Sequence, residues 1–283
     1  MKKILLTGST GFIGSTLVKA LSRKYLIYVI LRKKSKKFSK NTNIVRIKYK
    51  NLKNLSNKIR KFKINTVIHC ATHYVKNHNF ADIKKLSDSN ILFGNIILEN
   101  LKKMGVKKFI NFSTVWENYD GKKGNYFNLY SAYKASFVNI IDYYKKKLNN
   151  VKFINLVISD TFGENDKRKK IINVLKVNYK KNQETKVVSK NLHMNLLNVA
   201  DVKSAIYLIL ERNYKSGEYL LENNKSYKIF NIVKNINNNK DKKIKVKWLS
   251  NKFLKEKSYK FKVLKGWKPV NSKIEDIVRI ITE

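Results

Sequence analysis

The stretch ILLTGSTGFIG at residues 4–14 decides the fold of this chain. Its apolar first residues are typical of a buried strand, a glycine-rich turn follows, and apolar spacing then predicts a helix over Ile13–Ser22. Gly8 permits the tight turn, Gly11 lets the backbone approach a pyrophosphate, and Gly14 lets the helix pack closely on the strand. This order predicts a dinucleotide site at the positive end of the helix. The residues expected at the cofactor are Thr7, Gly8, Ser9, Thr10, Gly11, Phe12, Ile13 and Gly14.

The first half of the chain alternates short apolar runs with segments of helical period, which is typical of βαβ units around a parallel sheet. The expected strands are Lys3–Leu6, Leu26–Leu31, Ile44–Tyr49, Thr66–Cys70, Lys108–Phe112 and Phe153–Ile158, and the expected helices after the first are Leu52–Phe62, Leu86–Met104 and Ser131–Leu148. Beyond about residue 160 the pattern is less regular. There we expect helices at Asp166–Lys176, Asn195–Arg212, Tyr227–Ile236 and Ile274–Ile281, and strands at Gly217–Leu221 and Lys243–Trp248.

The predicted fold class is therefore α/β, a Rossmann-type doubly wound parallel sheet with a smaller C-terminal substrate-binding lobe. We expect the dinucleotide-binding domain to span residues 1–158 and the substrate-binding lobe to span residues 159–283. Parts of that lobe, near residues 195–212, are expected to pack back on the first domain.

Charge is the most unusual feature of the composition, since 62 Lys and Arg against 19 Asp and Glu give a net charge of +43. A clustered excess would indicate nucleic acid or another polyanion as partner. Here the basic residues are dispersed, and residues with AT-rich codons (Lys, Asn, Ile, Tyr, Phe) are abundant. Compositional drift is therefore favoured over a nucleic-acid partner, which stays open as an alternative.

Several classes of protein are excluded by composition. Hydrophobic residues make up 43% of the chain, which is too many for wholesale disorder. The single cysteine points to a reducing compartment. No apolar run approaches the roughly 18 residues of a membrane span, and the apolar stretch at the N-terminus is too short for a signal peptide. We expect a cytoplasmic protein that does not contact a membrane.

The end of the second predicted strand favours NADP(H). An acidic residue there would bind the ribose diol of NAD, but the sequence reads Leu31-Arg32-Lys33-Lys34-Ser35. Arg32 could stack on adenine and pair with a 2′-phosphate. NAD(H) stays possible, because Lys and Arg are common throughout this chain.

Tyr130 and Lys134 lie four residues apart on a predicted helix and so share one face. A phenol has an unperturbed pKa of about 10, and a nearby ammonium favours its ionised form. The pair could therefore exchange a proton with substrate, with Lys134 also reaching the nicotinamide ribose. Tyr133 is a less suitable candidate, since Phe137 stands where its lysine would be.

Ser113 and Thr114 end the fifth predicted strand, at the sheet edge where open α/β sheets bind ligands. Thr114 could hydrogen-bond the oxygen on which charge develops during hydride transfer. The alternative is a purely structural role, in which the Thr114 hydroxyl caps the segment that follows. We expect Thr114, Tyr130 and Lys134 to be the catalytic residues.

These motifs resemble the extended short-chain dehydrogenase/reductases, the NAD-dependent epimerase/dehydratases of nucleotide sugars. Further matches are Val67–Ala71, Asn90, Phe162-Gly163, Leu197–Val202 and Gly266–Pro269. The resemblance implies a homodimer formed by the two long helices and a nucleotide-diphosphate sugar as substrate. It also implies that Ala71, Thr72, Ser113 and Ile158 line the cofactor site.

Three segments are most similar to the branch of CDP-abequose and CDP-paratose synthases, namely Ala71–Tyr74, Thr114–Trp116 and Asp160–Arg168. That likeness implies an NADP(H)-dependent 4-ketoreductase that makes a CDP-linked deoxysugar for surface polysaccharide such as O-antigen. Two departures are Glu164, where relatives have proline, and the lack of a proline before Tyr130. Dehydratases of the family carry an Asp-Glu pair after the threonine, whereas this chain has Val115 and Trp116, so we do not expect 4,6-dehydration. Glu117 is only a remote substitute for that pair.

Cations in the second lobe could bind a diphosphate, and Arg168 suits it best because its guanidinium can pair bidentately. A solvated face is the alternative for the neighbouring lysines. His69 and Cys70 are adjacent on a strand and point to opposite faces, so we expect no metal site. The residues expected at the substrate are Thr114, Trp116, Asp160, Arg168, Lys170 and His193.

The leading hypothesis is thus a nucleotide-sugar 4-ketoreductase. A 4-epimerase with retained NAD is the first alternative, and a non-catalytic NADP-binding or nucleic-acid-binding protein on the same fold is the second. The sequence does not choose the base, the sugar or the stereochemical outcome.

Overall fold

The computed structural model describes residues 1–32, 38, 41–255 and 257–283, with Arg32 described by its backbone alone. Within those residues the chain forms two compact units. Unit 1 comprises residues 1–157, 209–220 and 259–262. Unit 2 comprises residues 158–208, 221–258 and 263–283. Two segments from the C-terminal half thus belong to unit 1.

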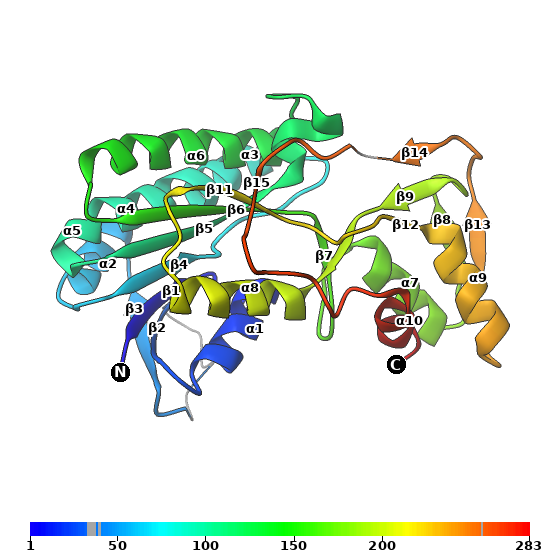
Figure 1. Cartoon of the computed structure of the whole chain (residues 1–283), viewed down its shortest axis with the longest axis horizontal. Coiled ribbons are helices and arrows are strands. Elements are labelled where there is room, and N and C mark those ends of the chain that lie inside the picture. The colour runs from blue at the N-terminus through cyan, green and yellow to red at the C-terminus, as the bar shows by residue number, and fades with distance from the viewer. Residues whose placement is uncertain (33–37, 39–40, 256) are drawn as a thin grey trace. The chain divides into compact units, whose positions relative to one another are not determined.

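A sheet forms the centre of unit 1, and eight strands of the described residues belong to it (Figure 1). They are β1 (Lys3–Thr7), β2 (Leu26–Arg32), β3 (Ile44–Tyr49), β4 (Thr66–His69), β5 (Lys108–Thr114), β6 (Lys152–Ile158), β11 (Gly217–Leu221) and β15 (Lys262–Val263). Their order in space is β15-β11-β6-β5-β4-β1-β2-β3. β1 pairs in parallel with both β2 and β4, so the strand order reverses there. Ligands of doubly wound sheets bind beyond the carboxyl ends of the strands at such a reversal.

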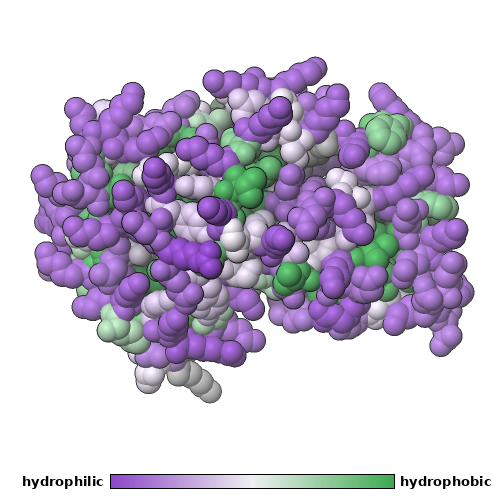
Figure 2. Space-filling view, in the orientation of Figure 1, coloured by the Kyte–Doolittle hydropathy of each residue, from purple (hydrophilic) through white to green (hydrophobic). Residues whose placement is uncertain are grey.

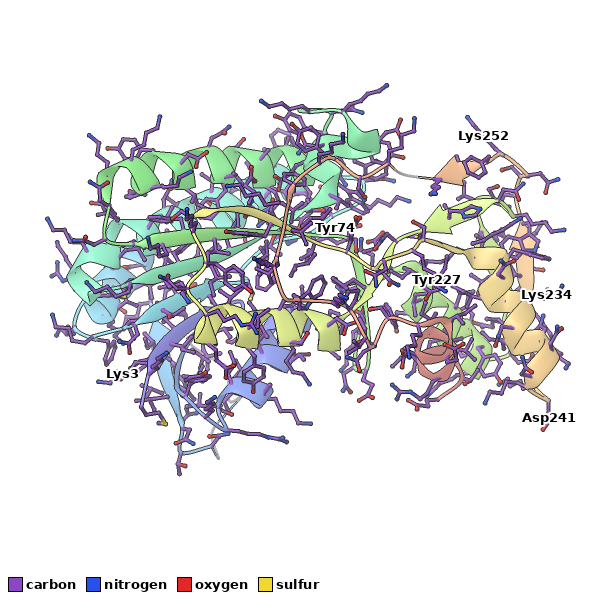
Figure 3. All side chains as sticks on the ribbon, in the orientation of Figure 1. Lys3, Tyr74, Tyr227, Lys234, Asp241 and Lys252 are labelled. Atoms are coloured by element: carbon purple, nitrogen blue, oxygen red, sulfur yellow. The ribbon has the colours of Figure 1, made fainter. Side chains whose placement is uncertain are left out.

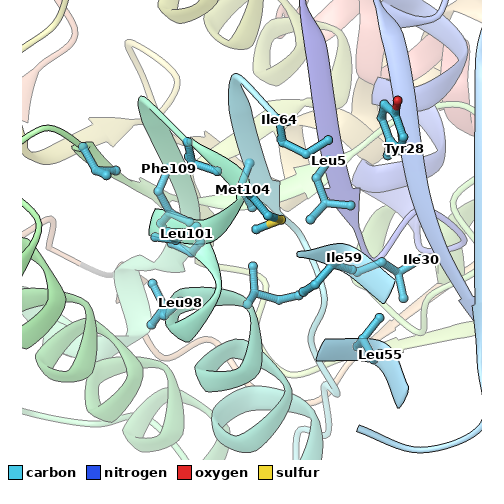
Figure 4. Close-up of a cluster of buried hydrophobic side chains, with 14 of the residues drawn as sticks. Leu5, Tyr28, Ile30, Leu55, Ile59, Ile64, Leu98, Leu101, Met104 and Phe109 are labelled. Atoms are coloured by element: carbon cyan, nitrogen blue, oxygen red, sulfur yellow. The ribbon is translucent and has the colours of Figure 1, made fainter. Parts of the chain in front are cut away.

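Helices cover both faces of this sheet, with α1 on one face and α2, α4 and α6 on the other (Figure 1). The helices of unit 1 are α1 (Phe12–Leu21), α2 (Leu52–Ile59), α3 (Phe80–Ser87), α4 (Phe93–Glu99), α5 (Leu101–Met104) and α6 (Leu129–Lys147). Apolar side chains of β1, β4 and β5 pack against α2, α4 and α6 to form the main core, part of which is drawn in Figure 4. Leu5, Val67 and Phe109 in this core have no exposed surface. The predicted fold class is confirmed.

The single helix predicted over Leu86–Met104 is wrong in detail. The helical segment begins earlier, at Phe80, and a π-helical turn over Asp88–Leu92 separates α3 from α4. Asn100 then ends α4, and Gly105 in the left-handed conformation ends α5. The apolar periodicity continues through these interruptions, so it could not reveal them.

Unit 2 consists of short strands and helices. They are β7 (Asp160–Phe162), α7 (Ile171–Lys180), β8 (Thr185–Val187), β9 (Leu192–Met194), β10 (Leu196–Asn198), α8 (Val199–Glu211, which extends into unit 1), β12 (Tyr227–Lys228), α9 (Ile229–Asn239), β13 (Val246–Trp248), β14 (Leu254–Lys255) and α10 (Ile274–Thr282). Their core joins α7, α9 and α10. Three predicted helices begin late: α7 starts after a loop at 166–170, and α8 and α9 each follow a strand.

Hydrophilic side chains cover most of the face seen in Figure 2, with small apolar areas between them. Lysine side chains project from elements of both units, among them the labelled Lys3 in β1 and Lys234 in α9 (Figure 3). The charge is therefore spread over the surface, as the sequence indicates. Across the residues described, no helix is both long and apolar enough to span a membrane.

Candidate active site

The glycine-rich loop leaves β1 and enters α1 with very little space around it. Gly8 has a φ of +65°, and a Cβ there would lie 2.5 Å from the carbonyl carbon of Cys70. A Cβ on Gly14 would lie 2.1 Å from the carbonyl oxygen of Gly8. Gly11 is the N-cap of α1, and no side chain caps the helix there. A helix N-terminus without a side-chain cap fits a pyrophosphate, because its dipole and its first N–H groups favour an anion there.

Ser9 supports that fit, because its side chain is fully buried in the loop and its Oγ has no hydrogen-bond partner among the described residues. A buried hydroxyl normally has a partner, so a bound anionic ligand would satisfy this one. The loop thus has the backbone shape and the free donors that a dinucleotide requires.

The segment after β4 is held close to this loop. The Ala71 N–H donates to Thr7 Oγ1 over 3.1 Å. Asn90, buried in the π-helical turn, accepts from the His73 N–H at 2.7 Å and from Thr72 Oγ1 at 3.0 Å. It also donates to the His73 carbonyl oxygen at 3.1 Å. The π-helical turn therefore places one amide side chain where it fixes residues 72 and 73.

The end of β5 supplies a buried hydroxyl and the start of a 3-10 segment (Val115–Gly121). The Trp116 N–H donates to Thr114 Oγ1 at 3.3 Å, so Thr114 does cap this segment. A hydroxyl that accepts one hydrogen bond still has its own proton to donate. Ser113 donates a short hydrogen bond to Glu117 Oε1, and the Thr114 N–H lies 3.4 Å from the same oxygen.

Helix α6 positions the Tyr130 and Lys134 side chains. Asn128 forms a capping box with Ser131 at its start, which fixes the first turn. Tyr130 is half-buried and meets the Tyr74 ring edge-on at a centroid distance of 5.1 Å. The Tyr74 ring also lies beside Trp116, with a centroid distance of 6.0 Å, so Tyr74 joins Trp116 after β5 to Tyr130 on α6. Lys134 is only 4% exposed.

Charges around Lys134 connect these segments. Burial lowers the pKa of the Lys134 ammonium below its usual value, and the nearby Glu117 carboxylate opposes that shift. Burial raises the pKa of Glu117 to about 7, against the Ser113 hydrogen bond and the Lys134 charge. Burial also raises the pKa of the Cys70 thiol well above its usual range. The backbone of Cys70 lies against Gly8 of the glycine-rich loop, and both Cys70 and Glu117 act on the ionisation of Lys134.

The structure holds Ala71 against the glycine-rich loop and the Trp116 backbone against Thr114, and Tyr74 links Trp116 to Tyr130. The charge of Lys134 interacts with that of Glu117. Sequence reasoning gave Glu117 only a remote role, although Thr114-x-x-Glu117 has the spacing of a capping box. It missed Tyr74 as a neighbour of Tyr130, and no local pattern signals that contact. The side chain of Arg32 lies outside the described residues.

The predicted substrate residues beyond β6 belong to unit 2. Arg168 pairs bidentately with Asp166, its Nε and Nη2 each donating over 2.8 Å, and Nη2 also donates to the Thr161 carbonyl oxygen at 2.7 Å. Lys170 pairs with Asp160 at 2.5 Å. His193 lies in strand β9, where the sequence predicts no strand, with its ring against Phe253. Ile158 is half-buried at the end of β6.

Three features define an enzyme of the short-chain dehydrogenase/reductase type. They are a parallel sheet whose strand order reverses at β1, a glycine-rich loop after β1, and a helix with the Tyr-x-x-x-Lys motif that packs on β5. Residues 4–232 match the model of the NAD dependent epimerase/dehydratase family, and the chain belongs to that family. The resemblance predicted from the motifs is confirmed.

The relatives agree with this assignment. The CDP-abequose synthase of Salmonella muenchen is 28% identical over 222 residues, 78% of this chain and 74% of the relative. That of Yersinia pseudotuberculosis is 29% identical over 219 residues, 77% and 75% of the two chains. The UDP-glucose 4-epimerase of Thermus thermophilus, solved with NAD, shares the fold with a TM-score of 0.81 at 20% identity, over 99% of this chain and 97% of that one.

Proposed function

We propose that this enzyme is an NADP(H)-dependent 4-ketoreductase of a CDP-linked sugar. The observation that carries the proposal is the sequence after Thr114, where Val115 and Trp116 stand in place of the acid pair of the family's dehydratases. Neither side chain can exchange a proton, which argues against dehydration. The two similar chains named CDP-abequose synthases support the choice of nucleotide.

Each catalytic role follows from the chemistry of the side chain. The bound nicotinamide dinucleotide supplies the hydride. Tyr130 donates its phenolic proton to the carbonyl oxygen that gains charge, and the Thr114 hydroxyl orients that oxygen by a hydrogen bond. Lys134, one helical turn from Tyr130, donates hydrogen bonds to ribose hydroxyls and stabilises negative charge on the phenol. Trp116, buried and in contact with Tyr74, is proposed to limit the space for the sugar.

We further propose that unit 2 binds the nucleotide part of the substrate, with Asp160, Arg168, Lys170 and His193 as contacts. Arg168 and Lys170 are each paired with a carboxylate. A diphosphate would have to compete with Asp166 and Asp160 for these cations, so we expect binding to rearrange both pairs. His193 is half-buried, and burial together with nearby lysines lowers its pKa, which favours a neutral ring.

The choice of NADP(H) rests on residues 31–35, which contain two lysines and Arg32 and no carboxylate. Residues 7–14, with Ala71, Thr72, Ser113 and Ile158, are the proposed cofactor contacts. Fluorescence titration with NADPH and NADH measures the preference directly. Tighter binding of NADPH that is lost in Arg32→Asp would support the assignment of the 2′-phosphate to Arg32, whereas equal binding of both dinucleotides would contradict it.

The reaction is tested with a panel of CDP-, dTDP-, GDP- and UDP-linked 4-keto sugars. We expect NADPH to be consumed fastest with a CDP-linked substrate, in amounts equal to the alcohol formed. Interconversion of 4-hydroxy epimers with retained NAD and no net NADPH loss would select the epimerase alternative instead. Consumption with none of the panel would refute the ketoreductase.

The proton path is tested by Tyr130→Phe. Loss of a proton donor from the reacting oxygen costs on the order of 100- to 10,000-fold in rate. NADPH binding should stay within about twofold of the wild type, because the ring remains in place. Tyr133→Phe, which lies between Tyr130 and Lys134 on the same helix but belongs to neither end of the pair, is the matched control and should retain activity. Full turnover by Tyr130→Phe would remove the phenol from the mechanism.

A further inference from the structure

Glu117 is a buried acid that the proposed proton path does not use. It lies three residues after Thr114 and is only 5% exposed. Its Oε1 accepts from the Ser113 hydroxyl and lies 3.4 Å from the Thr114 N–H, so two donors from the end of β5 fix the carboxyl group. Two donors on one oxygen favour the ionised form, because a carboxylate accepts hydrogen bonds more strongly than a carboxylic acid.

The 3-10 segment that carries Glu117 packs against α6, on which Lys134 is buried, and each charge shifts the ionisation of the other. A second acid, Glu218 on β11, also acts on the ionisation of Glu117. Glu218 is itself bound to Asn155 over 2.7 Å, and Asn155 is bound to Asn111 over the same distance. The Glu218 carboxylate is thus held by the sheet.

A buried ammonium needs an anionic partner, because removal of a charge from water costs far more than a few hydrogen bonds return. The charge of Lys134 also acts on the ionisation of Cys70 and of His69. Burial holds the Cys70 thiol and the His69 ring in their neutral forms, the first by raising its pKa and the second by lowering its pKa to about 3. Among the titratable groups described around Lys134, Glu117 is therefore the one that supplies a negative charge.

We propose that Glu117 is a positioning residue, whose buried carboxylate keeps Lys134 charged beneath the candidate active site. Lys134 can then donate hydrogen bonds to a bound dinucleotide at pH values where a buried lysine without a counter-charge would already be neutral. The proposal rests on the proposed function only for the contact between Lys134 and the dinucleotide. Glu117 itself touches neither substrate nor cofactor.

The test compares NADPH binding by the wild type, Glu117→Gln and Glu117→Asp from pH 6 to 10, by fluorescence. Glutamine keeps the size and the acceptor but removes the charge. We expect the alkaline loss of binding to begin at least one pH unit lower in Glu117→Gln, which is about a tenfold weaker Kd at a pH inside that window. Glu117→Asp should restore most of the shift, because it restores the charge.

Two further variants separate electrostatics from packing. Glu218→Gln removes the other acid and should leave the alkaline loss of NADPH binding at the pH of the wild type, because Glu218 acts on Glu117 rather than on Lys134. Ser113→Ala removes one donor to Glu117 and keeps a readout if Glu117→Gln fails to fold. Because Ser113 is also a proposed cofactor contact, only the pH at which binding is lost is compared, and not the affinity; that pH should shift in the same direction as in Glu117→Gln but by less.

If Glu117→Gln lost NADPH binding at the same alkaline pH as the wild type, whatever its absolute affinity, the proposal would be overturned and the ketoreductase would still stand. A wild type that binds neither NADPH nor NADH at any pH would overturn the proposed function itself, and the role of Lys134 with it. A shifted alkaline loss of binding in a protein that reduces no sugar of the panel would support Glu117 and contradict the ketoreductase.

Discussion

His69 is a buried imidazole that lies beside the candidate site without reaching it. Its Nδ1 lies 3.1 Å from Thr7 Oγ1, which already accepts from the Ala71 N–H. Nδ1 and the Thr7 hydroxyl share one hydrogen bond, and the buried Nε2 has no hydrogen-bond partner among the described residues. The ring packs against Phe93, Phe109 and Phe137, with centroid distances of 5.1 to 6.2 Å. The apolar surroundings explain why burial is the main cause of its lowered pKa.

Acid should destabilise the protein partly through His69. Its pKa is about 3 when folded against a usual 6.5, so the unfolded chain binds a proton first as the pH falls. Stability is lost between pH 6.5 and about 3, by at most about 1.4 kcal/mol per pH unit. The free energy of unfolding, measured with urea, should therefore fall more steeply between pH 7.5 and pH 5 for the wild type than for His69→Gln. The exposed His78→Gln is the control, and parallel curves for His69→Gln and the wild type would contradict the prediction.

At the scale of elements, the first turn of α8 is tied to the segment before α10. Asp201, fully buried, accepts from the backbone N–H groups of Val270 and Asn271 at 3.0 Å and from the Ser272 hydroxyl at 2.5 Å. The Trp267 indole donates to the Asp201 carbonyl oxygen at 3.1 Å. One carboxylate thus fixes an otherwise irregular stretch of unit 2.

Asp201→Asn should be strongly destabilising, because the amide nitrogen faces donors and leaves buried N–H groups without a partner. We expect a loss on the order of 3 kcal/mol in the free energy of unfolding. Asp241→Asn, at the exposed end of α9 in Figure 3, is the matched control and should change stability by less than about 0.5 kcal/mol. Thermal unfolding of both variants measures the difference, and equal melting temperatures would count against the role given to Asp201.

Sequence patterns predict β1 to β6 of unit 1 well because these strands are apolar runs of four to seven residues. They fail in unit 2, where β7, β9 and β10 have three residues each. The Leu-Leu-Asn of β10 looks the same as the start of a helix, so the helix predicted over Asn195–Arg212 includes it. The tertiary partner, and not local propensity, decides such positions.

The site follows the same division. Thr114, Tyr130 and Lys134 could be named from spacing alone, because helix and strand periods place them. The ionisation of Lys134 could not be predicted from spacing, since it depends on Glu117, on Cys70 and on how deeply α6 is buried. Nor could the π-helical turn be foreseen, although it is what aims Asn90 at the segment after β4.

At the scale of the molecule, α4 and α6 present an open groove of about 560 Å³ on the surface of unit 1. Its lining is mainly apolar, and Tyr143 is 57% exposed there. Apolar surface of this kind is typical of subunit contacts. The groove supports the proposal that the protein is a homodimer through these two helices.

A single charge in that groove should separate the subunits. Ile140→Glu is expected to elute as a monomer in size-exclusion chromatography with light scattering, whereas the wild type is expected to elute as a dimer. Val177→Glu, on exposed surface of α7, is the matched control and should leave the mass unchanged. A wild-type monomer would refute the dimer, and a dimeric Ile140→Glu would move the interface elsewhere.

The order of strands in the sheet has a consequence for synthesis. β6 has β5 on one side, but its other neighbour, β11, lies some sixty residues further along the chain. Until the ribosome has released residue 221, the nascent sheet ends in an unpaired, apolar edge, which is a template for association with other chains. Truncations within residues 159–216 should therefore collect in inclusion bodies, and folding in the cell should depend on a chaperone that shields β6 until its late partner emerges.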